Sequence, residues 1–93
     1  MNYVYVLVSD DDEPESYIGV TSDLRHRFNQ HNQGLNASTR GRKWRLAYYE
    51  AYLSRRSAEK RERLLKLNGR SRRFLMQRVW SSLEESGAQG DVI

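Results

Sequence analysis

The 93-residue sequence contains no cysteine, which excludes a disulfide framework and any metal site built from thiolates. Only two histidines are present, so a histidine-rich zinc site is not expected. No apolar run approaches the roughly 20 residues that a membrane-spanning helix needs. The first residues also lack the basic and then apolar segments of a signal peptide. These absences predict a small cytoplasmic protein with no membrane partner.

Acidic residues are scarce through the middle of the chain. All sixteen Lys and Arg residues lie between Arg25 and Arg78, and that span contains only three acidic residues. The only proline and five acidic residues lie instead in Asp10–Ser16, which we interpret as an exposed turn. This concentration of Lys and Arg in a small domain favours a polyanionic partner, and nucleic acid is the commonest one. The alternative is a surface whose basic side chains serve only solubility.

Three stretches have strand character: Tyr3–Val8, Tyr17–Val20 and Trp44–Leu53. The first is apolar on both alternating faces, which predicts a central strand covered on both sides. The acidic turn joins it to the second as a hairpin. In the third, alternation would place four side chains on one face: Leu46, Tyr48, Glu50 and Tyr52.

Three further stretches have helical spacing: Leu24–Asn32, a segment from Ser54 or Ser57 to Leu67, and Arg72–Leu83. Ser22 or Asp23 is expected to cap the first helix and Ser71 the third. The predicted fold is α/β of the α+β type, with a small three-stranded antiparallel sheet flanked by three helices in the order β-β-α-β-α-α. We expect one domain over residues 1–83 and a disordered tail over residues 84–93.

The first predicted helix carries Arg27 and His31 four residues apart, so both project on the same side. His31 lies on the apolar stripe with Leu24 and Phe28, and Arg27 lies at its border. An arginine there can bury its stem and bind a phosphate with two donors. Spacing alone favours a surface arginine and a histidine that serves packing.

The second predicted helix places Glu62 on one face with Ala58 and Leu65. Burying a carboxylate costs several kcal/mol unless a cation or donors compensate, and Mg²⁺ or Mn²⁺ would suit a hard oxygen ligand. The alternative, which the pattern alone favours, is an ion pair with a nearby cation, for which the candidates are Arg27, Arg61 and Lys66.

Two tyrosines, Tyr5 and Tyr17, fall on adjacent predicted strands. A phenol has an unperturbed pKa of about 10 and becomes a useful general base only where positive charge lowers that value. Tyrosines in strands more often serve packing. Gly19 would permit close backbone approach to a ligand or a helix, or would mark a kink.

Taken together, these residues resemble the GIY-YIG endonuclease superfamily, specifically its small single-domain bacterial members. The matching pieces, in order, are Tyr3-Val4-Tyr5, Tyr17-Ile18-Gly19, Leu24 with Arg27 and His31 followed by Asn32 and Gly34, a looser Tyr49-Glu50-Ala51, and Ala58 with Glu62 and Lys66. The resemblance covers roughly residues 3 to 75. One departure is Tyr3, which stands where the name of the first motif would put glycine.

The resemblance implies hydrolysis of a phosphodiester with one divalent metal, Mg²⁺ or Mn²⁺, held by Glu62. It implies that Tyr5 or Tyr17 helps to deprotonate water, that Arg27 stabilises the charge that develops on phosphorus, and that His31 belongs to the catalytic set. Expected substrate-binding residues are Gly19, Lys66, Arg25, Arg40, Arg42 and Lys43.

Two main hypotheses follow. The first is a structure-directed DNA endonuclease, as in DNA repair, with DNA favoured over RNA. The second is a catalytically weak nucleic-acid-binding module of the same fold, acting with a possible protein partner. In the second, aromatic side chains would stack on unpaired bases: Trp44, Tyr48, Tyr49 and Tyr52. A third reading is a protein-interaction domain with an acidic partner, and the oligomeric state is left open.

Overall fold

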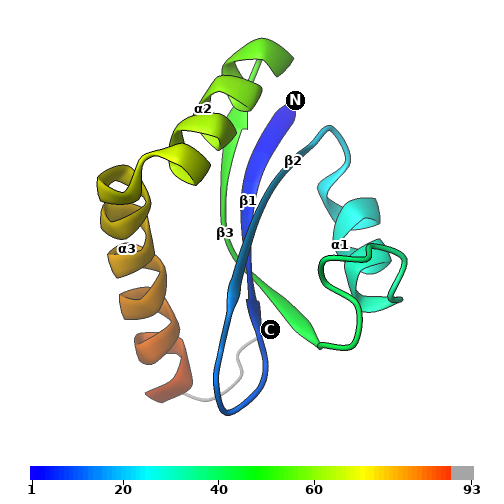
Figure 1. Ribbon diagram of the computed structural model, residues 1–93, viewed down its shortest axis with the longest axis vertical. Helices are drawn as coiled ribbons and strands as arrows, with labels where there is room; N and C mark the ends of the chain where they lie inside the picture. The colour runs from blue at the N-terminus through cyan, green and yellow to red at the C-terminus, as the bar shows by residue number, and fades with distance from the viewer. Residues whose placement is uncertain (89–93) are drawn as a thin grey trace.

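A computed structural model describes residues 1–88 of the chain. Its elements are β1 (Asn2–Ser9), β2 (Ser16–Thr21), α1 (Leu24–Asn32), β3 (Trp44–Tyr52), α2 (Arg55–Leu67) and α3 (Gly69–Ala88). The predicted order β-β-α-β-α-α is confirmed. Helix α1 lies beside one face of the sheet, and α2 and α3 lie on the other (Figure 1).

The three strands form one antiparallel sheet in the order β2-β1-β3, so β1 is the central strand, as its apolar faces predicted. In β1 the even-numbered side chains face α2 and α3, and the odd-numbered ones face α1. Tyr5 pairs with Gly19 on β2 and with Tyr49 on β3. Both faces of β1 are therefore buried, and two separate side-chain layers form around it.

The larger layer packs α2 and α3 against the sheet through aliphatic residues: Val4, Val6, Val8, Ile18, Ala58, Leu65, Leu75 and Val79. The smaller layer lies under α1 and is largely aromatic: Tyr5, Leu7 and Trp44 are buried, with Tyr17, Leu24 and Phe28 partly buried around them. The aliphatic layer supplies most of the apolar burial that drives folding. The aromatic layer contains the phenols and the imidazole singled out from the sequence.

The ends of the helices follow their capping side chains. Asp23 caps α1 by accepting a hydrogen bond from the His26 N–H at 3.1 Å, and Ser54 caps α2 through the Ser57 N–H at 3.3 Å. These observations decide between the alternatives left open for both caps.

The predicted start and end of the third helix were wrong. Helix α3 begins at Gly69, and Asn68 caps it by accepting a hydrogen bond from the Ser71 N–H at 3.0 Å, so Ser71 lies inside the helix. At its other end α3 continues to Ala88. Residues 84–88 are therefore helical and do not belong to a tail, while residues 89–93 lie outside the described part of the chain.

One predicted face of β3 was also wrong. The pairing of β1 with β3 shifts between Val6 and Leu7, so that Val6 faces Tyr48 but Leu7 faces Leu46. A bulge of this kind moves the following side chain to the opposite face of the sheet. Leu46 consequently does not share a face with Tyr48, Glu50 and Tyr52.

Candidate active site

The Tyr5 side chain lies across the backbone of β2 at Gly19. A Cβ atom at position 19 would be 2.5 Å from the Tyr5 hydroxyl oxygen and 2.6 Å from its ring. Real Cβ atoms do not approach other atoms so closely, so this position requires glycine while Tyr5 keeps its place. The group that approaches Gly19 is thus a side chain of the neighbouring strand, whereas the sequence suggested a ligand or a helix. This contact places the Tyr5 hydroxyl at the edge-strand side of the sheet.

The Tyr5 hydroxyl is held by His31 from α1. The Tyr5 hydroxyl oxygen and His31 Nε2 are 2.8 Å apart, and His31 Nδ1 is 2.7 Å from the Thr39 hydroxyl oxygen. All three residues are at most 1% exposed. Burial lowers the pKa of His31, and the positive charge of Arg27 lowers it further. The imidazole is therefore neutral at physiological pH, with one nitrogen protonated.

Arg27 and Tyr17 lie beside this pair. The Tyr17 ring centroid is 4.9 Å from that of His31 and 6.4 Å from that of Tyr5. Burial raises the pKa of Tyr5, and its interaction with the Arg27 guanidinium opposes that rise. The same interaction raises the pKa of Arg27. Arg27 also donates a hydrogen bond to Gln30 Oε1 at 3.2 Å, which holds the guanidinium toward the phenols.

Glu62 reaches the same region from α2. Its carboxylate is 3.3 Å from Lys66 Nζ, and that ammonium lies 5.9 Å from the centre of the Tyr17 ring. The negative charge of Glu62 is also among the causes that raise the pKa of Tyr5. The Glu62 side chain is 21% exposed, so it is neither buried in the aliphatic layer nor free in solvent. The ion pair with Lys66 is one of the alternatives that the sequence left open.

Comparison with known protein families adds to this geometry. Residues 1–75 match the model of the GIY-YIG catalytic domain. The chain belongs to the GIY-YIG family. It is also 36% identical over 88 residues to a UPF0213 protein of Clostridium perfringens, an alignment that covers 92% of each chain. No solved structure matches the chain. The GIY-YIG catalytic domain is a nuclease-type phosphodiesterase domain, and the family generally uses a divalent metal.

The residues present fit such a metal. Among residues 1–88, no group of three or more His, Cys, Asp or Glu side chains could enclose an ion, and Glu62 is the one carboxylate that reaches the phenols. Mg²⁺ keeps several of its waters and is commonly bound by one or two carboxylates together with phosphate oxygens of the substrate. A single partly exposed carboxylate beside a basic surface satisfies that requirement.

The basic residues expected to bind substrate are spread along the surface. Arg25 is exposed on α1, and Lys43 is exposed just before β3. Arg40 donates a hydrogen bond to the Gly34 carbonyl at 2.9 Å, which closes the loop between α1 and β3. Arg42 differs from these because it pairs with the acidic turn, at 2.9 Å from Asp11 and 3.5 Å from Glu15. Its positive charge is thus already compensated.

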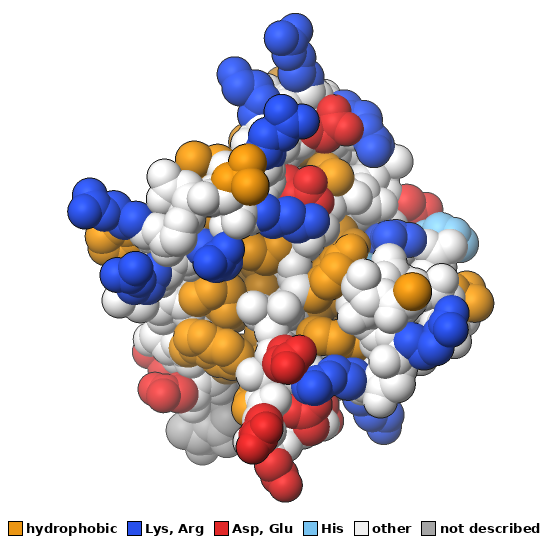
Figure 2. Space-filling view, viewed as in Figure 1, with side chains coloured by type: hydrophobic (Ala, Val, Ile, Leu, Met, Phe, Trp, Pro, Cys, Tyr) orange, Lys and Arg blue, Asp and Glu red, His pale blue; other side chains and the backbone are white. Residues whose placement is uncertain are grey.

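Lys and Arg side chains surround much of the face seen in Figure 2, and acidic side chains gather at its lower end, where Figure 1 places the turn between β1 and β2. Hydrophobic side chains line the hollowed centre of this face. No helix in the described part of the chain is long and apolar enough to cross a membrane.

The sequence did not reveal the part played by Thr39. It lies in an aperiodic loop, where nothing distinguishes a buried threonine from an exposed one. The Thr39 carbonyl accepts a hydrogen bond from Trp44 Nε1 at 2.8 Å. The Asn32 side chain in turn bonds both backbone groups of Trp44, at 2.8 and 3.2 Å. The sequence shows Asn32 as part of the family pattern and Trp44 as a core or stacking residue, and it predicts neither of these hydrogen bonds.

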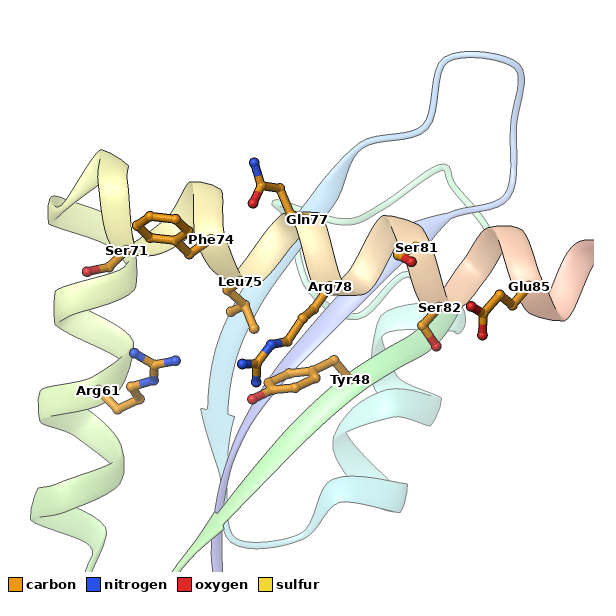
Figure 3. A pocket seen from close by; sticks show the side chains of 10 residues that line it. All are labelled: Tyr48, Arg61, Ser71, Phe74, Leu75, Gln77, Arg78, Ser81, Ser82 and Glu85. Carbon is orange, nitrogen blue, oxygen red and sulfur yellow. The ribbon is translucent and has the colours of Figure 1, made fainter.

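A hollow lies on the opposite side of the sheet from the phenols. It measures about 770 Å³ and is lined by α2, α3 and Tyr48 of β3 (Figure 3). Its two arginines are Arg61 and Arg78, and Arg61 is bonded to Glu50 at 2.9 Å. Glu85 lines the same hollow, so opposite charges balance there. This hollow is therefore separate from the group of phenols, imidazole and guanidinium at the aromatic layer.

Proposed function

We propose that this protein is a metal-dependent endonuclease that hydrolyses phosphodiester bonds in DNA. The observation that carries the proposal is the convergence of distant segments at one edge of the sheet: Tyr5, Tyr17, Arg27, His31 and Glu62. Hydrolysis of a phosphodiester is accelerated by groups that accept a proton, stabilise negative charge and bind a hard cation. The phenols, the guanidinium and the carboxylate can fill these three roles.

The two phenols differ in their access to solvent. Tyr5 is 1% exposed and its hydroxyl is held by His31, whereas Tyr17 is only half-buried. Tyr17 is therefore the phenol that contacts the attacking water. Tyr5 connects the reacting groups to the neutral imidazole of His31. A neutral imidazole can take up a proton, which a hydroxyl group alone does not do well near pH 7.

Arg27 stabilises the charge that builds up on the phosphoryl oxygens. The guanidinium stays protonated at every working pH, since its interaction with Tyr5 raises its pKa further. It is also held in place by Gln30 and needs little rearrangement to meet an anion. Glu62 is the residue that would hold Mg²⁺ or Mn²⁺. When bound there, such an ion supplies Lewis-acid stabilisation of the phosphate and of the leaving oxygen.

The substrate that fits best is DNA of distinctive shape, such as a flap, a branch or a single strand. The basic side chains of the described domain contact phosphates without regard to sequence, so the shape of the DNA is what they can distinguish. Gly19, Lys66, Arg25, Arg40 and Lys43 are the substrate contacts in this proposal. Arg42 is assigned mainly to the acidic turn, because Asp11 already neutralises it.

The experiment is a cleavage assay on labelled flap, branched, single-stranded and duplex DNA, with Mg²⁺, Mn²⁺ or EDTA. We expect cleavage only with divalent ion and a loss of about a hundredfold or more in Arg27→Ala and Glu62→Ala. The matched control is Glu59→Ala, since Glu59 lies on the same helix, is 53% exposed and pairs with Arg55 at 3.4 Å. Cleavage that persists in Glu62→Ala, or that requires no divalent ion, would contradict the proposal. Equal cleavage of every substrate shape would contradict the proposed preference for DNA of distinctive structure.

A second candidate function is nucleic-acid binding without useful catalysis, and one observation favours it. Lys66 occupies the Glu62 carboxylate at 3.3 Å, so an ion must displace an existing partner. In that case the wild type binds DNA in a salt-sensitive way but cleaves none of the substrates with any divalent ion. The same assay therefore separates the two functions.

A further inference from the structure

Thr39 ends a chain of polar groups that runs through the aromatic layer. From the loop inward, the chain consists of the Asn36 carbonyl, the Thr39 hydroxyl, the His31 ring and the Tyr5 hydroxyl, with Arg27 beside the phenol. The joining distances are 3.4 Å from Asn36 O to Thr39 Oγ1, 2.7 Å from Thr39 to His31 and 2.8 Å from His31 to Tyr5. Within this chain, Thr39 and His31 must each donate to one neighbour and accept from the other.

The two ends of this chain allow only one direction of donation. At the inner end, His31 Nε2 is the only hydrogen-bond partner of the Tyr5 hydroxyl among residues 1–88, and the Arg27 guanidinium beside the phenol has donors and no acceptor, so Tyr5 donates its proton to His31 Nε2. At the outer end, the Asn36 carbonyl can only accept, so the Thr39 hydroxyl donates outward. Its oxygen is then free to accept from His31 Nδ1–H. Both ends thus require the same tautomer of the imidazole, with the proton on Nδ1 and a bare Nε2.

We infer that Thr39 is a positioning residue that fixes His31 in the Nδ1–H tautomer and thereby keeps Nε2 available to the Tyr5 hydroxyl. The hydroxyl of Thr39 is well placed for this task because it is buried and its own backbone is fixed. Thr39 is 1% exposed, and its carbonyl is bonded to the indole of Trp44. The inference rests on the proposed function for its catalytic consequence, but its structural content does not depend on cleavage.

The consequence for the reaction concerns the path of one proton. As Tyr5 passes its proton to His31 Nε2, its oxygen accepts in the same step the proton released by the attacking water, so no free phenolate forms, and the imidazole becomes a cation with both nitrogens protonated. The Nδ1–H bond to Thr39 is kept throughout. In the opposite tautomer Nε2 already carries a proton, so Tyr5 has no acceptor, and its O–H would have to point at the donors of Arg27.

The first test reads the tautomer directly, with ¹⁵N-labelled histidine and two-bond ¹H–¹⁵N spectra of the metal-free protein without DNA. We expect His31 in the wild type to show a protonated Nδ1 and a bare Nε2, while the exposed His26 serves as an internal reference for an unconstrained imidazole. Thr39→Val removes the acceptor with little change in shape, so His31 should move toward the other tautomer. Thr39→Ser should restore the wild-type spectrum.

The second test measures cleavage and its pH profile in the same variants. We expect Thr39→Val to lower kcat by about tenfold to a hundredfold, in the range seen for other groups that orient a reacting imidazole, with KM little changed. Thr39→Ser should recover most of kcat, and Ser38→Ala, its exposed neighbour, should leave it unchanged. The charged or titratable groups that face His31 are Tyr5 of β1, Tyr17 of β2 and Arg27 of α1, and none of them is altered.

The outcomes separate this inference from the proposed function. A wild-type His31 with its proton on Nε2 would overturn the inference even if the protein cleaves DNA, and so would an unchanged tautomer in a folded Thr39→Val. Should Thr39→Val fail to fold, the wild-type and Thr39→Ser spectra still decide. A protein that shows the expected tautomers but cleaves nothing would support the role of Thr39 in positioning and count against the endonuclease.

Discussion

The Tyr5 phenol lies over Gly19, so closely that a Cβ atom at position 19 would meet its oxygen at 2.5 Å. This contact sets where the hydroxyl can be, and it therefore sets the 2.8 Å bond to His31. The phenol and the glycine are partners across the β1–β2 pair, so the central strand and the edge strand together position the Tyr5 hydroxyl in the candidate site.

Gly19→Ala should displace the Tyr5 ring and disturb its bond to His31. Overpacking of this kind typically costs about 1–3 kcal/mol of unfolding free energy, and the cleavage rate should fall further than that loss of stability explains. The matched control is Gly69→Ala, where an added Cβ meets no atom within 4 Å. Urea unfolding and cleavage kinetics of both variants give the comparison. An active, wild-type-like Gly19→Ala would show that the position of Tyr5 does not matter.

Glu50 joins β3 to α2 through a compact set of hydrogen bonds. Its carboxylate accepts three hydrogen bonds from Arg61, one from Tyr48 at 2.6 Å and one from Tyr52 at 2.5 Å. Arg61 precedes Glu62 in the sequence, so this contact also fixes the rotation of the helix that presents Glu62. Glu50→Gln leaves the Arg61 guanidinium without its anion and should lower the unfolding free energy by about 2–3 kcal/mol. Glu59→Gln, on the exposed side of the same helix, should cost less than about 0.5 kcal/mol.

The hydrogen-bonded group around Glu50 also predicts how the free energy of unfolding depends on pH. Burial alone would favour the neutral acid, but the hydrogen bonds from Arg61, Tyr48 and Tyr52 lower the pKa of Glu50 below its usual value. A carboxyl whose pKa is lower in the folded state stabilises the protein above its unfolded pKa of about 4.3, and this stabilisation is lost as the pH falls through the folded pKa.

At the alkaline side, burial and the bond to Glu50 raise the pKa of Tyr52 to about 12. A phenol with a raised pKa stabilises the fold fully below about pH 10 and loses that effect as the pH rises toward its folded pKa.

Thermal unfolding from pH 2 to 11 tests these signs. The wild type should lose stability below about pH 4 more steeply than Glu50→Gln, because only the wild type has this carboxylate to protonate. Parallel curves for the two proteins across the acid range would show that Glu50 is not the group responsible.

Lys66 competes with any cation for the Glu62 carboxylate. The pair is partly exposed, with Lys66 at 49%, and exposed pairs are worth about 1 kcal/mol at most. Lys66→Met should therefore raise the affinity for Mn²⁺ by no more than about fivefold, while weakening the binding of DNA through loss of a phosphate contact. Calorimetric Mn²⁺ titration of the free protein measures the first effect. A decrease in Mn²⁺ affinity would show that the lysine does not compete for this carboxylate.

Arg25 and Arg42 carry the same charge but differ in their surroundings. Arg25 is exposed on α1 and makes no salt bridge with any residue from 1 to 88, whereas Arg42 is 2.9 Å from Asp11. Arg25→Gln should reduce the slope of log affinity for DNA against log salt by about 1, and Arg42→Gln should change it much less. Fluorescence anisotropy at several salt concentrations measures both slopes. Equal changes would mean that the acidic turn releases Arg42 when DNA binds.

Most of the fold was predictable because its signals are local. The spacing of Leu24, Phe28 and His31 predicted the face that α1 buries, and the two apolar faces of β1 predicted its central place. The start of α3 was missed because Asn68 and Ser71 are both good capping residues three positions apart, and the sequence does not rank them. Leu46 was placed on the wrong face because a bulge changes the alternation without any marker such as glycine.

The site was predictable only in part, for a physical reason. Periodicity shows which face of a helix is buried, so it could place Arg27, His31 and Glu62 near the sheet. It cannot show which partner each polar group takes across the fold. The bond of His31 to Thr39 joins a helix to an aperiodic loop, and the bond of Glu62 to Lys66 was one of several alternatives.

A divalent ion held by Glu62 would lie beside the two phenols, and line broadening by Mn²⁺ in NMR spectra reports its position. At substoichiometric Mn²⁺ we expect selective broadening of the side-chain signals of Tyr17 and Lys66, and loss of this broadening in Glu62→Gln but not in Glu59→Gln. The competing binder is the acidic turn at residues 10–15, which holds five carboxylates. Broadening confined to that turn and unchanged in Glu62→Gln would show that Glu62 holds no ion.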